Sequence, residues 1–153
     1  TAQMAVSSRH PTVSSLKPGF VAAAGAAPGF EMVKWDSVQN VQVTTLDALI
    51  AEEGVPRYIK IDVEGFELDV LSGLSRPVAI ISVEYLPGLP DLTHAVIDRL
   101  LELGPYRFNP VRGEEGDFLW DEWSDAEAVK RWLASLSADD KSGDLYAMLP
   151  DQA

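Results

Sequence analysis

The chain has 153 residues, no cysteine, and 24 acidic against 12 basic residues, for a formal net charge of -12. This length suits one domain with its own hydrophobic core. The negative charge argues against nucleic acid or an anionic membrane as a partner, because both bind basic surfaces. The absence of cysteine excludes disulfides and a cysteine nucleophile and fits a cytoplasmic protein. No apolar run is long enough to span a bilayer.

Residues 1–40 carry the weakest pattern, because glycines and prolines interrupt them repeatedly. We expect loops and one short helix there, followed by a βα core over 41–153 within one partial domain. The stretch 25–29, Gly-Ala-Ala-Pro-Gly, resembles a phosphate-binding loop only superficially, since it follows no predicted strand and contains a proline. We therefore assign it no cofactor.

Beyond residue 40, predicted strands alternate with predicted helices. The strands are expected at VQVTTL from residue 41, then at 58–63, 78–86, 106–111 and 144–149. The helices are expected at 46–53 with Thr44 or Thr45 as N-cap and Gly54 at the end, at 66–74, from 91 or 93 to 103, and at 125–136 with Ser124 as N-cap. This alternation predicts an α/β fold with a mostly parallel sheet, an antiparallel C-terminal edge and helices on both faces.

The segment 59–74, IKIDVEGFELDVLSGL, is the most informative part of the chain. A strand rich in β-branched residues ends in Asp62 and Glu64 and turns directly into a helix, and Glu84 ends the next predicted strand. We expect the two strands to be adjacent and parallel, so that the three carboxylates meet at the edge where α/β proteins bind ligands. The side chains expected to be buried are those of Ile59, Ile61, Val63, Ile80, Ile81 and Val83.

The same segment resembles the FkbM family of S-adenosylmethionine-dependent methyltransferases. Further stretches that agree with the family in order and spacing are VSSL at 13–16, VTTLDALI at 43–50, SVEYLP at 82–87, LGPYRFNPVRGE at 103–114 and SGDLYAML at 142–149. The resemblance implies a Rossmann-like class I methyltransferase sheet, S-adenosylmethionine as cofactor, and a hydroxyl of a sugar or secondary metabolite as acceptor.

The chain departs from that family pattern in its N-terminal third. The resemblance implies a glycine-rich loop after a first strand and an acid at the end of a second strand, and neither is found. The sequence also begins at Thr1 rather than methionine. We therefore expect a C-terminal portion that binds the cofactor weakly by itself and self-associates through an incomplete sheet edge. The alternative is a non-catalytic α/β binding or scaffolding remnant.

Site roles follow from the resemblance and from the chemistry of carboxylates. Asp62 is the first choice for contact with the cofactor, and Glu64 or Glu84 for accepting the proton of the acceptor hydroxyl. Capping of a helix N-terminus is the competing role for Asp62 and Glu64. No metal is assigned, although the same three carboxylates offer the oxygen ligands that Mg²⁺ prefers.

Four further residues are assigned near the cofactor or beside the turn. Gly65 is expected to allow a tight turn or a close backbone approach there. Ser14 and Ser15 are candidates for cofactor or acceptor contact, with a plain turn as the more ordinary role. Glu67, one turn into the predicted helix, is expected on a solvated face or in a local salt bridge.

Overall fold

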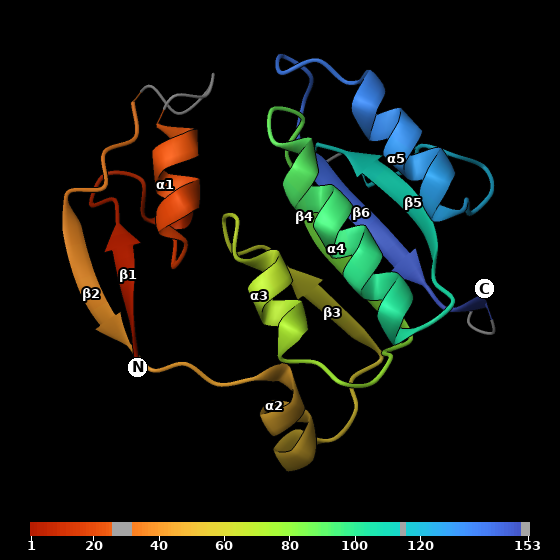
Figure 1. Cartoon of the computed structure of the whole chain (residues 1–153), viewed down its shortest axis with the longest axis horizontal. Helices are drawn as coiled ribbons and strands as arrows, with labels where there is room; N and C mark the ends of the chain where they lie inside the picture. The colour runs from red at the N-terminus through yellow and green to blue at the C-terminus, as the bar shows by residue number, and fades with distance from the viewer. Residues whose placement is uncertain (26–31, 114–115, 151–153) are drawn as a thin grey trace.

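The computed structural model describes residues 1–25, 32–113 and 116–150, and their strands form two separate sheets (Figure 1). The elements in chain order are β1 (Ala2–Val6), the 3-10 turn η1 (Pro11–Val13), α1 (Pro18–Ala24), β2 (Ser37–Val41), α2 (Leu46–Glu53), β3 (Tyr58–Ile61), α3 (Glu67–Ser72), β4 (Ile80–Tyr85), α4 (Pro90–Leu103), β5 (Arg107–Arg112), α5 (Ala126–Ser135) and β6 (Gly143–Met148). None of the helices in these ranges is both long and apolar enough to cross a membrane.

The larger sheet has four strands in the order β3-β4-β6-β5. β3 and β4 pair in parallel with Ile61 opposite Val83, as the sequence predicts, and α3 connects them. The sheet is mixed, so a mostly parallel sheet is not confirmed: β6 inserts between β4 and β5 and pairs antiparallel to both. The C-terminal strand is antiparallel as predicted, but it lies inside the sheet and not at its edge. The alternation of strands and helices along a chain does not specify where a late strand inserts, and here that position makes the sheet mixed.

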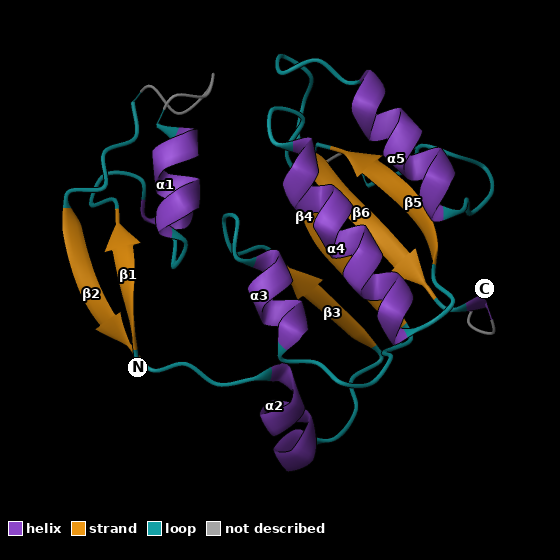
Figure 2. Cartoon of the chain, viewed as in Figure 1, coloured by secondary structure: helices purple, strands orange, loops and turns teal. Residues whose placement is uncertain are grey.

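One face of this sheet forms the hydrophobic core. Ile81, Val83 and Leu145 lie on it with no exposed surface, and α3, α4 and α5 pack against that face in a single layer (Figure 2). Ile61 is also buried as predicted. The other three predicted core positions are only partly buried, namely Ile59, Val63 and Ile80. Ile59 lies on the edge strand, and Ile80 points to the opposite face.

That opposite face carries no helix among the described residues, so the prediction of helices on both faces is wrong. Its cover comes from aromatic side chains instead. Tyr58 stacks on Tyr146 with ring centroids 6.1 Å apart, and Phe118 meets Tyr146 edge-on at 5.3 Å. The helices that follow β3 and β4 contact one another, which places them in the same layer and leaves the second face without a helix among the described residues.

The expectation of loops in the first forty residues is also incomplete. β1 and β2 form a two-stranded antiparallel sheet, with Ala2 opposite Val41, and α1 is the short α-helix that the described part of this segment contains. β2 therefore ends at the residue where the sequence predicts a strand to begin. Its side chains are mostly exposed, so it lacks the apolar alternation by which a strand is recognised. The stretch 25–29 lies outside the described residues except for Gly25.

Helix ends follow side-chain chemistry. The Thr45 hydroxyl accepts a hydrogen bond from the backbone N–H of Ala48 at 3.1 Å, and α2 stops at Gly54 with a φ of 93°, both as predicted. For α5 the N-cap is Asp125 rather than Ser124. The backbone of Ser124 is instead bridged to β5, which moves the helix start one residue on.

Candidate functional site

Asp62, Glu64 and Glu84 converge at one edge of the larger sheet, with one carboxylate oxygen of each within 4.8 Å of the others. Asp62 directly follows β3 and Glu84 lies near the end of β4, so the parallel pairing of these strands places both acids at the same edge. Glu64 reaches them from the turn that joins β3 to α3. The sequence prediction that the three acids meet is confirmed.

The turn holding Glu64 has an unusual backbone. Glu64 has a φ of 53° and Gly65 a φ of 86°, and the left-handed region costs a non-glycine residue roughly 1–2 kcal/mol. A Cβ atom at Gly65 would lie 2.5 Å from the ring of Phe20, so only glycine fits there. Gly65 therefore has the predicted part in a tight turn and a close approach. The contribution of Phe20, 45 positions away, has no local signal in the sequence.

The carboxylate that caps this turn belongs to Glu67. Its side chain is only 6% exposed, and its Oε1 accepts hydrogen bonds from the backbone N–H groups of Val63 at 3.3 Å and Gly65 at 3.1 Å. The expectation of a solvated face for Glu67 is wrong. Capping by Glu64 is also not what the structure shows, since α3 begins after Phe66 without a side-chain cap. The sequence carries no clear signal for this role, because acids are also favourable in the exposed first turn of a helix.

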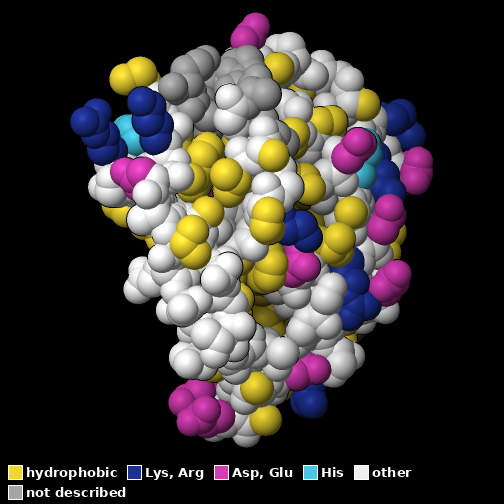
Figure 3. Space-filling view, turned by 60° about the vertical axis from the view of Figure 1, so that its left-hand side comes forward, with side chains coloured by type: hydrophobic (Ala, Val, Ile, Leu, Met, Phe, Trp, Pro, Cys, Tyr) yellow, Lys and Arg dark blue, Asp and Glu magenta, His cyan; other side chains and the backbone are white. Residues whose placement is uncertain are grey.

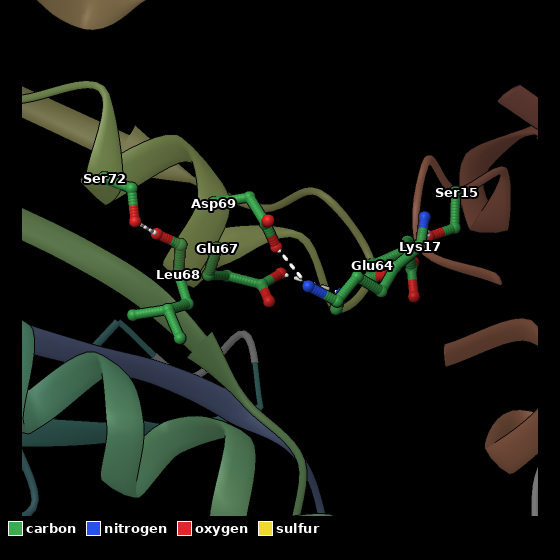
Figure 4. A network of polar contacts seen from close by, with 8 residues as sticks. Ser15, Lys17, Glu64, Glu67, Leu68, Asp69 and Ser72 are labelled. Carbon is green, nitrogen blue, oxygen red and sulfur yellow. Dashed lines mark hydrogen bonds and ion pairs between the residues drawn. The ribbon is translucent and has the colours of Figure 1, made fainter. Parts of the chain in front are cut away.

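Ser15 binds the same turn from the N-terminal side. Its hydroxyl donates to the backbone oxygen of Glu64 at 2.7 Å and accepts from the N–H of Lys17 at 3.0 Å, and Lys17 forms an ion pair with Asp69 (Figure 4). Both hydrogen-bonding functions of this hydroxyl are thus engaged within the chain. The Ser14 hydroxyl is buried without a hydrogen-bond partner among the described residues. Contact of either serine with a cofactor stays a prediction.

Burial and mutual repulsion raise the pKa of two of the three acids, Glu64 and Glu84. Burial first, then the charges of Asp62 and Glu67, raise the pKa of Glu64 to about 7. Burial and the neighbouring acids, Glu64 foremost, raise the pKa of Glu84 to about 8. Lys60 bonds to Asp144 at 2.8 Å and lies 3.9 Å from Asp62, so this cation lies on the Asp62 side of the cluster. Two of the acids therefore exchange protons near neutral pH.

Three cavities open onto the cluster, and each is bordered by a different pair of its acids. Asp62 and Glu84 border one of about 450 Å³, Asp62 and Glu64 one of about 390 Å³, and Glu64 and Glu84 another of about 450 Å³. The second also contains Ser14 and the exposed, apolar Leu49. Figure 3, in which the left-hand side of Figure 1 is turned forward, shows apolar side chains gathered across the middle of the surface in view. Two reactants therefore have room to approach the acids from different sides.

A protein-family model described as the methyltransferase FkbM domain matches residues 5–137 of the chain. The matched range contains all three acids of the cluster, the turn between β3 and α3, and the N-terminal segment that holds the turn. No curated protein and no solved structure matches the chain.

Proposed function

Because the chain belongs to the FkbM methyltransferase family, we propose that it transfers a methyl group from S-adenosylmethionine to a hydroxyl of a sugar or secondary metabolite. The observation that carries this proposal is the carboxylate cluster of Asp62, Glu64 and Glu84, placed where separate cavities meet. A transfer reaction needs two ligands held against each other, and the cluster borders more than one binding space. Positioning of this kind supplies a large part of the rate in bimolecular reactions.

The cofactor fits the described residues by charge. A sulfonium is a cation, and the cluster presents negative charge that is only partly offset by Lys60. Asp62 and Ser14 border the cavity that Asp62 shares with Glu64 and would hold the donor there, whereas Gly65 would act through the shape of the turn. When bound, S-adenosylmethionine supplies an electrophilic methyl group and leaves as a neutral thioether. No glycine-rich loop follows a strand in the described ranges, so we expect weak donor binding by these residues alone.

The proton of the acceptor hydroxyl requires a base, and the two raised carboxyls suit that role. Glu64 or Glu84 accepts this proton as the acceptor oxygen forms its bond to the methyl carbon. A base whose pKa lies near the working pH is both available and effective. With pKa values of about 7 and about 8, both glutamates are stronger bases than an ordinary carboxylate and are still ionised in part at pH 7 to 8.

A second candidate is Mg²⁺-assisted chemistry, favoured by the mutual approach of the three carboxylates within 4.8 Å. Hard divalent cations bind through carboxylate oxygens. A cation at this position would keep both glutamates ionised and bind their oxygens, so these oxygens would no longer accept the proton in the first mechanism. Transfer measured with EDTA and with added Mg²⁺ separates the two, since the base mechanism predicts equal rates.

The deciding experiment uses the full-length gene product that carries this sequence. It is incubated with methyl-labelled S-adenosylmethionine and a panel of sugars and hydroxylated metabolites, each paired with its deoxy analogue as the control. We expect label in the hydroxyl compounds only. Label in amine or carbon acceptors, or none in any hydroxyl, contradicts the proposal. Calorimetry on the 153-residue chain alone should show weak cofactor binding, and micromolar affinity, about -8 kcal/mol, would contradict the expectation of weak donor binding.

A further inference from the structure

Burial of the Glu67 side chain has a high cost in free energy. Its side chain is 6% exposed, and within the described ranges it makes no salt bridge. A buried carboxylate without a cation is strongly disfavoured unless hydrogen bonds satisfy it. Its recorded donors are the backbone N–H groups of Val63 and Gly65, on the two sides of Glu64. A leucine would fill the same space at the base of α3 without this cost.

The 62–65 turn that Glu67 holds has a backbone conformation that needs support from surrounding contacts. Glu64 sits in the left-handed region, which persists in proteins only where surrounding contacts enforce it. Glu67 binds this turn from the side of α3, whereas Ser15 binds the Glu64 carbonyl from the N-terminal side. Figure 4 shows the two sets of contacts reaching the turn from opposite directions. The turn is clamped between them.

We propose that Glu67 is a positioning residue, whose buried carboxylate holds the 62–65 turn in the left-handed form that brings Glu64 to Asp62 and Glu84. This role rests on the proposed methyl transfer, because it names the group that aims the proton acceptor. Glu67 and Glu84 also border one small cavity of about 10 Å³, so Glu67 faces the cluster from the helix side. The charge of Glu67 thereby acts on the two acids that it aligns.

Two variants can therefore separate the hydrogen bonds that Glu67 makes to the turn from the effect of its negative charge. Glu67→Gln keeps a side-chain oxygen that can accept both N–H groups but removes the negative charge, whereas Glu67→Ala removes both. Charged groups around Glu64 and Glu84 come from several elements, namely Asp62, Glu67, Asp144 and Lys60, and His10 and Asp140 border the cavity that the two glutamates share. Because these variants differ from the parent at residue 67 alone, any shift in the titration midpoint of Glu64 or Glu84 is attributed to the change at Glu67.

The test follows the glutamate carboxyls and the amides of Val63 and Gly65 by NMR in the full chain. With Glu67→Gln, we expect the titration midpoints of Glu64 and Glu84 to fall while both amides stay protected from exchange. With Glu67→Ala, protection at both amides and the left-handed coupling constant of Glu64 should be lost. Glu127→Gln, an exposed acid in the first turn of α5, is the matched control and should change none of these signals.

Turnover adds a second readout that a purely structural residue does not move. The acid limb of the pH–rate profile should shift to lower pH in Glu67→Gln, and kcat should fall about 100-fold in Glu67→Ala. If no variant transfers methyl groups but the NMR changes occur, the clamp stands and the proposed function fails. Unchanged midpoints in Glu67→Gln together with an intact turn in Glu67→Ala, or equal shifts in Glu127→Gln, would overturn the proposal.

Discussion

The N-terminal unit, residues 1–25 and 32–41, and the unit of the larger sheet (the sheet unit), residues 46–113 and 116–150, differ in how they are stabilised. Every buried residue of the main hydrophobic cluster comes from the sheet unit, where α3, α4 and α5 cover one face of the larger sheet. The N-terminal unit contributes none to it, and β2 is almost fully exposed. The sheet unit thus has a core of its own, whereas the N-terminal unit depends on local pairing and on docking.

The docking contacts concentrate on the turn that carries Glu64. Ser15 bonds to its carbonyl, Lys17 pairs with Asp69, and Phe20 lies against Gly65. The unit outside the main core therefore holds the strained part of the site, while the unit that contains the core supplies the strands that bring the acids together. We therefore expect variants that affect fold stability or site geometry separately.

The largest expected effect falls in the core of the sheet unit. Phe108, in β5, has no exposed surface, and Phe108→Ala should lower the free energy of unfolding by about 4 kcal/mol through lost burial and a residual cavity. Val38→Ala in β2, where the side chain is 66% exposed, is the control and should change it by less than about 0.5 kcal/mol. Urea unfolding measures both. Similar losses in the two variants would contradict the comparison of the units.

A smaller effect is expected where the two units touch. Gly65→Ala combines a left-handed backbone with a Cβ that meets the Phe20 ring, and should cost about 3 kcal/mol. Gly54→Ala has a similar φ of 93° but open space around the new methyl group, so it should cost about 1 kcal/mol. Equal losses in urea unfolding would mean that Phe20 does not press on the turn.

Stability should also depend on pH through Glu84. Its pKa is raised from 4.5 to about 8, so the folded state binds more protons than the unfolded state between these values, and unfolding becomes easier as pH rises. Glu84→Gln removes this loss. The variant should match the parent near pH 4 and exceed it by about 2 kcal/mol at pH 9, less than the full shift implies because water screens part of the charge. A difference that is constant over pH would contradict the raised pKa.

The sequence predicts the sheet unit far better than the N-terminal unit, for a physical reason. Runs rich in β-branched apolar residues mark β3 and β4, and Thr45 and Gly54 delimit α2, because burial and capping leave local signatures. The exposed β2 has no such signature. The position of β6 within the sheet and the contact of Phe20 with Gly65 depend on long-range packing, which no local pattern encodes.

The same distinction applies to the site. The meeting of Asp62, Glu64 and Glu84 follows from two strands that end in acids, so the sequence predicts it correctly. The buried role of Glu67 depends on which way its side chain turns at the start of α3, and an amphipathic pattern favours the solvent for an acid. Acids that are placed by the ends of strands are thus easier to predict here than the acid that holds the turn between them.

The smallest stability effect is expected at the clamp. Ser15→Ala removes the hydrogen bond to the Glu64 carbonyl and should cost about 1 kcal/mol. Ser72→Ala removes a hydroxyl bond of similar length, 2.8 Å to the carbonyl of Leu68 within α3, and should be nearly neutral because alanine favours the helix. Thermal unfolding of the two variants measures the difference. A Ser15→Ala protein as stable as Ser72→Ala would mean that the hydrogen bond from Ser15 to the turn contributes nothing to the stability of the fold.

The most direct test of the catalytic role of the carboxylate cluster is the turnover of Asp62→Asn in the full-length gene product, measured together with its melting temperature. The change is nearly isosteric and removes only charge and basicity from a side chain that is half exposed. If Asp62 acts on the reactants, turnover should fall by about 100-fold or more while the melting temperature stays within about 2 °C of the parent. A lowered melting temperature with unchanged turnover per folded molecule would instead make Asp62 a structural cap and contradict the account.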